Sequence, residues 1–263
     1  MFAKSFSHSI VSCVLFAILI AISGAAAGAT QTPTPTRSPS ETVREFYKAM
    51  REKRFREAFA LSIYKPAIEN LKPQEFEDLR PDFERIALAV GEKIPGEVNI
   101  TGEQISRDDA TVFLKMLDAD GKEKLEPTML IKFESQWVVG DRESLQLVKK
   151  AGKEFFFNAR IDAHHSDVQD MLTRISLAQL FYSQQHNGLF ADLATLITAG
   201  LVPKDLEGTE STGYRFHIKS LNGGKSWNAS AEPAQYGRTG RLSFYMDAAG
   251  VRSADKGGKP LTP

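Results

Sequence analysis

Two adjacent histidines and two nearby aspartates form the cluster of this sequence best suited to hold a metal ion. His164 and His165 stand side by side, with Asp162 and Asp167 close to them. Neighbouring residues on a helix point about 100° apart, so the two histidines cannot easily share one ion. Asp162 and His165 could supply two ligands, whereas a useful site needs at least three. We therefore expect a solvated helix face here and no metal site.

Two further stretches imitate ligand-binding loops. Gly223–Ser226 matches the end of a phosphate-binding loop, but Lys219 stands where the first glycine should be, and no helix follows to present amides. Asp118–Gly121 resembles the start of a calcium loop, but its glycine comes early and Met129 replaces the closing glutamate. Both are predicted to be turns. The sequence also lacks the G-x-S-x-G motif that surrounds the nucleophilic serine of many hydrolases. We therefore expect no catalytic residues and no cofactor.

The composition excludes several classes of function. The 263 residues include 33 basic and 33 acidic ones, so no net charge attracts nucleic acid or an anionic membrane. With 42% hydrophobic and 25% charged residues, the bulk of the chain is expected to be globular. The single cysteine, Cys13, lies in an N-terminal apolar run. If that run is removed, disulfides, thiolate nucleophiles and cysteine-ligated metal sites are excluded.

Residues 1–29 have the layout of a secretory signal peptide, because Lys4 precedes an apolar run that ends in small residues. The rival interpretation is an uncleaved signal anchor, since residues 10–29 approach the roughly 20 that span a bilayer. In either case the rest of the chain is expected outside the cytoplasm, in the periplasm or anchored to the inner membrane and facing outward. Residues 30–39 are a Thr/Pro linker, which is expected to be extended.

Residues 40–150 are predicted to form an α+β domain. Ser38, Pro39 and Glu41 have the spacing of a capping box that begins a helix. Further helical segments follow, of which the last is predicted over Pro81–Val90. The hydrophobic period then changes to two over about four strands. A block of helices followed by antiparallel strands is typical of the α+β class.

This order resembles the nuclear transport factor 2-like fold, particularly its exported bacterial members of unknown function. The matching features are the opening SPSETVREFYKAM, the helix around FERIALAV and the closing hairpin ESQWVVGD, which together cover residues 38–147. The resemblance implies a cone-shaped domain of helices on an antiparallel sheet. Members of this fold include ligand-binding pockets, a few isomerases and many scaffold modules, so the fold does not select a function.

Aromatic side chains of this first domain are candidates for a ligand-binding role. In a cone-shaped domain of the kind that the resemblance implies, they can line a cavity between the sheet and the helices. The alternative, which we favour, is that they fill the core. The set comprises Tyr47, Phe59, Phe113, Phe133 and Trp137.

A long helix is predicted over Asn158–His186, where apolar residues recur with the helical period and Asn187–Gly188 supply a typical ending. Residues 144–157 are interpreted as a basic connector into it. Four short strands are predicted within residues 214–252. Because a small sheet needs a packed face to be stable, we expect the helix to supply the core of this second domain.

The second half resembles the globular part of type IV pilin-like proteins and type II secretion pseudopilins. The resemblance rests on AQLFYSQQHNGLFADLATLITAGLVP, TGYRF and GRTGRLSFYMDAAGVRS, and it covers residues 162–253. It implies a helix packed on a small antiparallel sheet over residues 155–255, followed by a tail at 256–263. True pilins fuse an apolar segment directly to this helix, whereas here a whole domain separates them. Fibre assembly through the helix is therefore not expected.

We interpret the sequence as an exported, non-enzymatic cell-envelope protein that acts through protein–protein contacts and is linked to secretion or pilus-type machinery. The expected contact surface is the exposed loop Glu232–Arg241, because Tyr236, Arg238 and Arg241 are residue types enriched at interface hot spots; a solvated loop is the alternative. Two other functions stay open, a small-molecule binder and an isomerase-like enzyme, both in the N-terminal cavity. No nucleic acid is expected as a partner, and a membrane only through residues 10–29 if they are uncleaved.

The signal layout generates a prediction about export. Because small residues follow the apolar run, the mature protein should begin near Gly28 or Thr30. N-terminal sequencing of protein recovered from the cell envelope measures this start directly. Envelope material that still begins at Met1 would identify a signal anchor instead.

Overall fold

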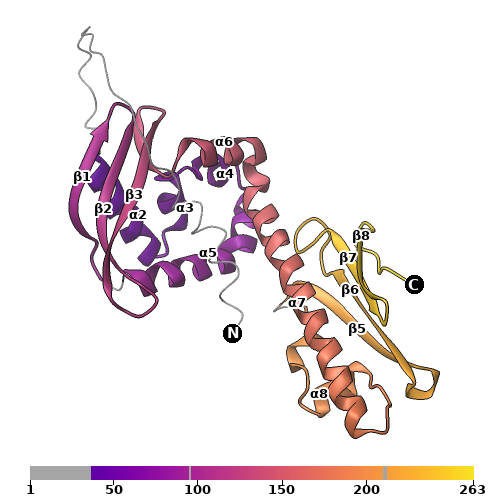
Figure 1. The fold of residues 1–263 in the computed structure, drawn as a ribbon. Helices are drawn as coiled ribbons and strands as arrows, with labels where there is room; N and C mark the ends of the chain where they lie inside the picture. The colour runs from indigo at the N-terminus through magenta and orange to yellow at the C-terminus, as the bar shows by residue number, and fades with distance from the viewer. Residues whose placement is uncertain (1–36, 95, 210–211) are drawn as a thin grey trace, which may run out of the picture. The chain divides into compact units, whose positions relative to one another are not determined.

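The structure is a computed structural model that describes residues 37–94, 96–209 and 212–263 (Figure 1). The predicted signal segment, Cys13 and most of the Thr/Pro linker lie outside these residues. The described chain is α+β, as the sequence predicts, with helices and two four-stranded antiparallel sheets. It divides between Phe156 and Phe157 into two compact units, each of which is described by itself below.

The helices that precede the first sheet among the described residues are α2 (Pro39–Arg51), α3 (Phe55–Ala60), α4 (Lys65–Glu69) and α5 (Pro73–Lys93). The predicted capping box at the start of α2 is confirmed. The Ser38 hydroxyl accepts the Glu41 N–H at 3.2 Å, and the Glu41 carboxylate accepts the Ser38 N–H at 2.7 Å. This pairing satisfies two backbone donors that the first turn of a helix leaves open.

Helix α5 corrects the prediction of a separate helix that begins at Pro81. The structure has one continuous helix with Pro81 inside it. An internal proline costs about 3 kcal/mol, because it removes a backbone hydrogen bond and crowds the preceding turn. Phe76, Leu79 and Phe83 are all buried along the helix. Burial of three large apolar side chains, each worth about 1.5–3 kcal/mol, offsets the cost of the proline.

The first sheet has the strand order β1-β2-β3-β4, with every neighbouring pair antiparallel. Its strands are β1 (Asn99–Ser106), β2 (Asp109–Leu117), β3 (Glu123–Phe133) and β4 (Gln136–Val139). Ala110, Val112 and Leu114 alternate along β2 and are all buried, so they define the inner face of the sheet. They share an apolar cluster with Val43 of α2, and Figure 1 shows α2 alongside these strands.

The predicted basic connector is a helix. Helix α6 (Arg142–Ala151) and a short 3-10 turn (Gly152–Glu154) lead directly into the next helix. Asp141 caps α6, since its carboxylate accepts the Ser144 N–H at 2.8 Å. Leu145 and Val148 are its buried positions. Leu145 and Val148 are three positions apart, which is helical spacing, so the sequence carried a signal for this helix that the prediction overlooked.

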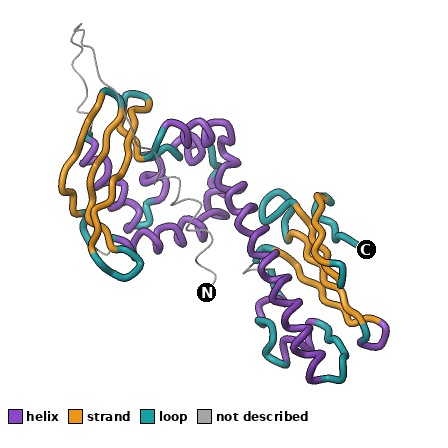
Figure 2. Tube along the Cα trace, viewed as in Figure 1, coloured by secondary structure: helices purple, strands orange, loops and turns teal. Residues whose placement is uncertain are grey.

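The second unit is built on α7 (Phe155–Gln185), close to the predicted range for the long helix. Helix α8 (Leu193–Thr198) and a 3-10 turn (Lys204–Glu207) follow it. The sheet has the order β5-β6-β7-β8, all antiparallel, and Figure 2 shows its strands beside α7. Its strands are β5 (Tyr214–Leu221), β6 (Ser226–Pro233), β7 (Leu242–Asp247) and β8 (Gly250–Asp255), with a 3-10 turn (Asn222–Gly224) between the first two. Each contains a predicted strand.

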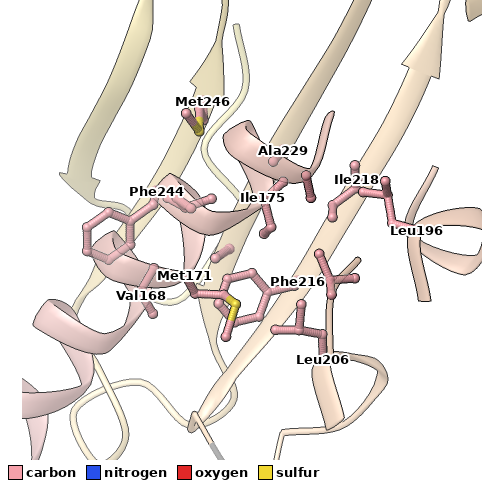
Figure 3. Packing of buried hydrophobic residues seen from close by; sticks show 14 of the residues in the cluster. Val168, Met171, Ile175, Leu196, Leu206, Phe216, Ile218, Ala229, Phe244 and Met246 are labelled. Atoms are coloured by element: carbon pink, nitrogen blue, oxygen red, sulfur yellow. The ribbon is translucent and has the colours of Figure 1, made fainter. Parts of the chain in front are cut away.

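One face of α7 is buried on the inner face of this sheet (Figure 3). The helix contributes Val168, Met171, Leu172, Ile175 and Ala178, and the sheet contributes Phe216, Ile218, Ala229, Ala231 and Phe244. Phe181 also belongs to the apolar period of the helix, but it is 50% exposed. The expected packing of helix on sheet is confirmed, whereas the likeness to pilins stays a prediction. Within the described ranges, no helix is long and apolar enough to cross a membrane.

Candidate functional site

Two of the aromatic candidates, Tyr47 and Trp137, lie together in the buried cluster between α2 and the first sheet. The Tyr47 hydroxyl hydrogen-bonds with the buried side chain of Thr128. Burial raises the pKa of Tyr47, and the nearby Glu126 carboxylate also raises it, so the phenol stays neutral. Thr128 and Glu126 were not among the residues predicted from the sequence. Strand alternation could have found them, because Glu126 pairs with the inward-facing Leu114 and Thr128 lies two residues further along β3.

The other three aromatic candidates lie elsewhere in the first unit. Phe59 of α3 packs on Phe83, with ring centroids 4.9 Å apart. Phe113 is half-buried and stands between two inward-facing residues of β2, so it belongs to the opposite face of the sheet. Phe133 ends β3, and the ammonium group of Lys149 lies 4.3 Å from its ring centroid. The structure does not bring the five residues into one group, and a ligand-binding role for them stays a prediction.

The loop between β6 and β7 carries the remaining candidates, and residues 234–241 are called the contact loop from here on. Its own hydrogen bonds close it. The Gly237 N–H donates to the Gly240 carbonyl at 2.8 Å, and the Thr239 N–H donates to the Gln235 carbonyl at 2.9 Å. The Thr239 hydroxyl in turn accepts the Gln235 N–H at 3.0 Å. The loop therefore has a defined backbone shape.

Tyr236 and Arg241 are exposed on the contact loop, as the sequence predicts. Tyr236 is 48% exposed, and its hydroxyl donates to the Asp255 carboxylate at 2.9 Å. That hydrogen bond raises the pKa of Tyr236. The pKa of Asp255 is lowered by the N–H of Gly257 and then by the Tyr236 hydroxyl. The Arg241 guanidinium donates to the Asn158 side-chain oxygen at 3.0 Å, so both side chains are held while they face solvent.

The prediction of an exposed loop is wrong at two positions. Arg238 is half-buried, with its guanidinium carbon 4.0 Å from the ring centroid of Phe157, and this cation–π contact holds it against α7. Glu232 belongs to β6 and is buried. Its carboxylate accepts a hydrogen bond from, or forms an ion pair with, His217 at 2.9 Å. Contacts between elements that are distant in the sequence bury both side chains.

The two adjacent histidines fasten the contact loop to α7. Nδ1 of His164 lies 2.8 Å from the Thr239 carbonyl, which can only accept, so this nitrogen donates. Nε2 of His165 accepts the N–H groups of Arg241 and Leu242 at 3.2 and 3.3 Å. The expectation of a solvated helix face is therefore wrong, because the rings of both histidines are turned against the loop. No group of three or more His, Cys, Asp or Glu side chains within the described ranges could hold a metal ion.

Two glycines leave room for this attachment. A Cβ atom at Gly213, where φ is +67°, would lie 2.6 Å from Nδ1 of His164, and a Cβ at Gly240 would overlap the Tyr214 hydroxyl. Tyr214 is fully buried, and its hydroxyl donates to the Leu242 carbonyl at 2.9 Å. Any larger residue at either glycine would push the loop away from the rings that hold it. Tyr214 and the two histidines were not predicted to be anchors of the loop, although Gly237 and Gly240 lie within it.

No protein-family model and no curated protein matches the chain. Among solved structures, the chain is similar to a protein of Campylobacter jejuni that is named an NTF2-like transpeptidase, with 14% sequence identity and a TM-score of 0.29. The match covers 40% of this chain and 100% of that chain. A TM-score this low does not establish a shared family or activity. The α+β class therefore rests on the helices and sheets described above.

The position of Arg238 generates a prediction about stability. Arg238→Ala should lower the free energy of unfolding of the second unit by about 1–2 kcal/mol, because it removes a partly desolvated cation–π contact and packed side-chain atoms. Denaturant unfolding can be followed by the fluorescence of Trp227 in a Trp137→Phe background, so that only this unit reports. The matched control is Arg252→Ala, which removes an exposed guanidinium 4.7 Å from the Tyr245 ring centroid. Equal losses in the two variants would contradict the assignment of Arg238.

Proposed function

We propose that the protein is exported to the cell envelope and acts there, without catalysis, by binding another protein through its contact loop. The observation that carries this proposal is the exposure of Tyr236 and Arg241 on a backbone that hydrogen bonds hold in place. Tyrosine and arginine dominate interface hot spots, since one buries a large ring and the other makes several directional hydrogen bonds. A loop that is ordered before binding loses less entropy when it binds.

The location and the family relationships belong to the same proposal. The layout of residues 1–29 supports export, with the protein in the periplasm or anchored to the inner membrane and facing outward. The sequence resemblances support a nuclear transport factor 2-like first domain at 40–150 and a pilin-like second domain at 155–255. Pilin-like domains occur in secretion and pilus-type machinery, and we propose a link of this protein to such machinery.

The two exposed side chains also define the chemistry of the partner surface. The Arg241 guanidinium has further N–H donors beyond the one that Asn158 accepts. A carboxylate can accept two such N–H groups side by side. Tyr236 presents a half-exposed ring whose hydroxyl is already bound to Asp255, so its contribution to binding is mainly apolar. The expected partner surface therefore has an apolar recess beside an acidic side chain.

Site-specific crosslinking in the envelope of the host tests this proposal. A photo-reactive residue in place of the exposed Gln235 should capture one protein, and Tyr236→Ala combined with Arg241→Ala should reduce the captured amount about tenfold or more. The matched control is Arg215→Ala combined with Lys219→Ala, at exposed positions of β5. Both pairs should leave the thermal unfolding of the protein nearly unchanged. Equal capture by both double variants, or capture of nothing by the unmodified loop, would contradict the proposal.

A second candidate function is small-molecule binding by the first unit. The hydroxyl groups of Tyr47 and Thr128, with Glu126 nearby, lie in otherwise apolar surroundings. This favours the second candidate, because small-molecule sites place a few polar groups among apolar walls. An isomerase-like reaction would need an acid or base at the same place, and Glu126 is the carboxylate that acts on the Tyr47 hydroxyl. Native mass spectrometry of protein purified from its host distinguishes this candidate, since a retained small molecule would add a fixed mass.

A further inference from the structure

The attachment of the contact loop to α7 includes one unusual acceptor. Nε2 of His165 accepts two hydrogen bonds, from the consecutive backbone N–H groups of Arg241 and Leu242. A ring nitrogen that accepts an N–H carries no proton of its own, so the imidazole is neutral and its hydrogen lies on Nδ1. A backbone N–H group can only donate a hydrogen bond and cannot accept one. The contact therefore exists only while Nε2 is unprotonated.

We propose that His165 is an acid-sensitive latch, whose protonation releases the backbone of Arg241 and Leu242 from α7. A proton added at Nε2 turns the acceptor into a donor that faces two other donors. Both hydrogen bonds are then lost, and the three N–H groups repel one another. Movement of the loop backbone away from the ring relieves this conflict, because the apolar face of α7 is packed on the sheet, whereas Arg241 is exposed.

The surroundings of His165 favour the neutral ring. Burial is the largest cause of its lowered pKa, Arg241 lowers the pKa further, and Asp162 acts in the opposite direction. Tyr214 and Phe244 place ring edges near the imidazole, with centroids 6.4 and 5.9 Å away. Burial also raises the pKa of Tyr214, which therefore carries no charge in this range. The latch is accordingly closed above about pH 6.5 and opens as the pH falls through the lowered pKa of His165.

His164 holds the other half of the loop and behaves differently. Its Nδ1 already donates to the Thr239 carbonyl, and a donor stays a donor when the ring gains a proton. Acid therefore leaves this hydrogen bond in place. Opening of the latch is confined to Arg241 and Leu242, while the Thr239 side of the loop keeps its attachment.

The latch also links pH to stability. Because the folded pKa of His165 lies below that of the unfolded chain, its contribution is fully present above about pH 6.5 and is lost as the pH falls through the folded pKa. Any consequence for partner binding rests on the proposed function, since acid would then reorganise the backbone that carries Arg241. The latch itself concerns only contacts within the second unit.

Amide NMR signals of the full chain test the latch without any partner. Between about pH 7.5 and about pH 4.5, the amide signals of Arg241 and Leu242 should shift together, with one midpoint below about 6.5 that equals the midpoint of the His165 ring signals. The amide of Gly237, which donates within the loop, should stay nearly constant. Constant amide signals of Arg241 and Leu242 while the His165 ring titrates would overturn the proposal.

The variant His165→Gln supplies the second arm of the test. A glutamine oxygen can accept the same N–H groups and does not titrate, so the pH response of the two amides should disappear. His186→Gln is the matched control, because His186 is exposed and stacks on Tyr182 instead of on the loop, and it should keep the full response. If His165→Gln does not fold, His165→Asn and the titration of the unmodified protein decide the matter. An unchanged response in the folded glutamine variant would overturn the latch and leave the proposed function untouched.

Discussion

The second unit depends on the burial of one apolar face of α7 against the sheet β5–β8. The inner side chains of the four strands would face water without the helix, and a small sheet needs such a packed face to be stable. Each large apolar side chain that this contact buries contributes about 1.5–3 kcal/mol, so α7 and the sheet should form and unfold together. The N-terminal part of the same helix carries His164 and His165. The position of the contact loop is therefore set by helix packing, and the loop residues alone do not determine it.

Local patterns in the sequence predicted most of the elements. The capping box of Ser38 and Glu41, the helical period around Ile175 and the alternation along β2 each depend on residues a few positions apart. The errors arose where tertiary contacts override local preference. Pro81 lies inside α5 because side chains on both sides of it are buried. Helix α6 is the exception, because Leu145 and Val148 have helical spacing that the prediction overlooked.

The candidate site was predictable only in part, for the same reason. Tyr236 and Arg241 could be chosen by residue type and by their place in a polar loop. The anchors could not, because the hydrogen bonds from the loop to His164 and His165 join residues 75 to 77 positions apart. Helical periodicity predicted a solvated face for these histidines. The same helix geometry correctly indicated that two neighbouring rings point in different directions. In the structure that divergence gives one ring a donor role and the other an acceptor role.

Hydrogen exchange of the full chain tests the dependence of the second unit on α7 most directly. If the helix and the sheet form one cooperative unit, the amides of Met171, Leu172 and Ile175 should exchange with the same opening free energy as those of Phe216, Ala231 and Phe244. Strand amides that stay protected while the α7 amides exchange freely would contradict this account, since the sheet would then be stable without its helix.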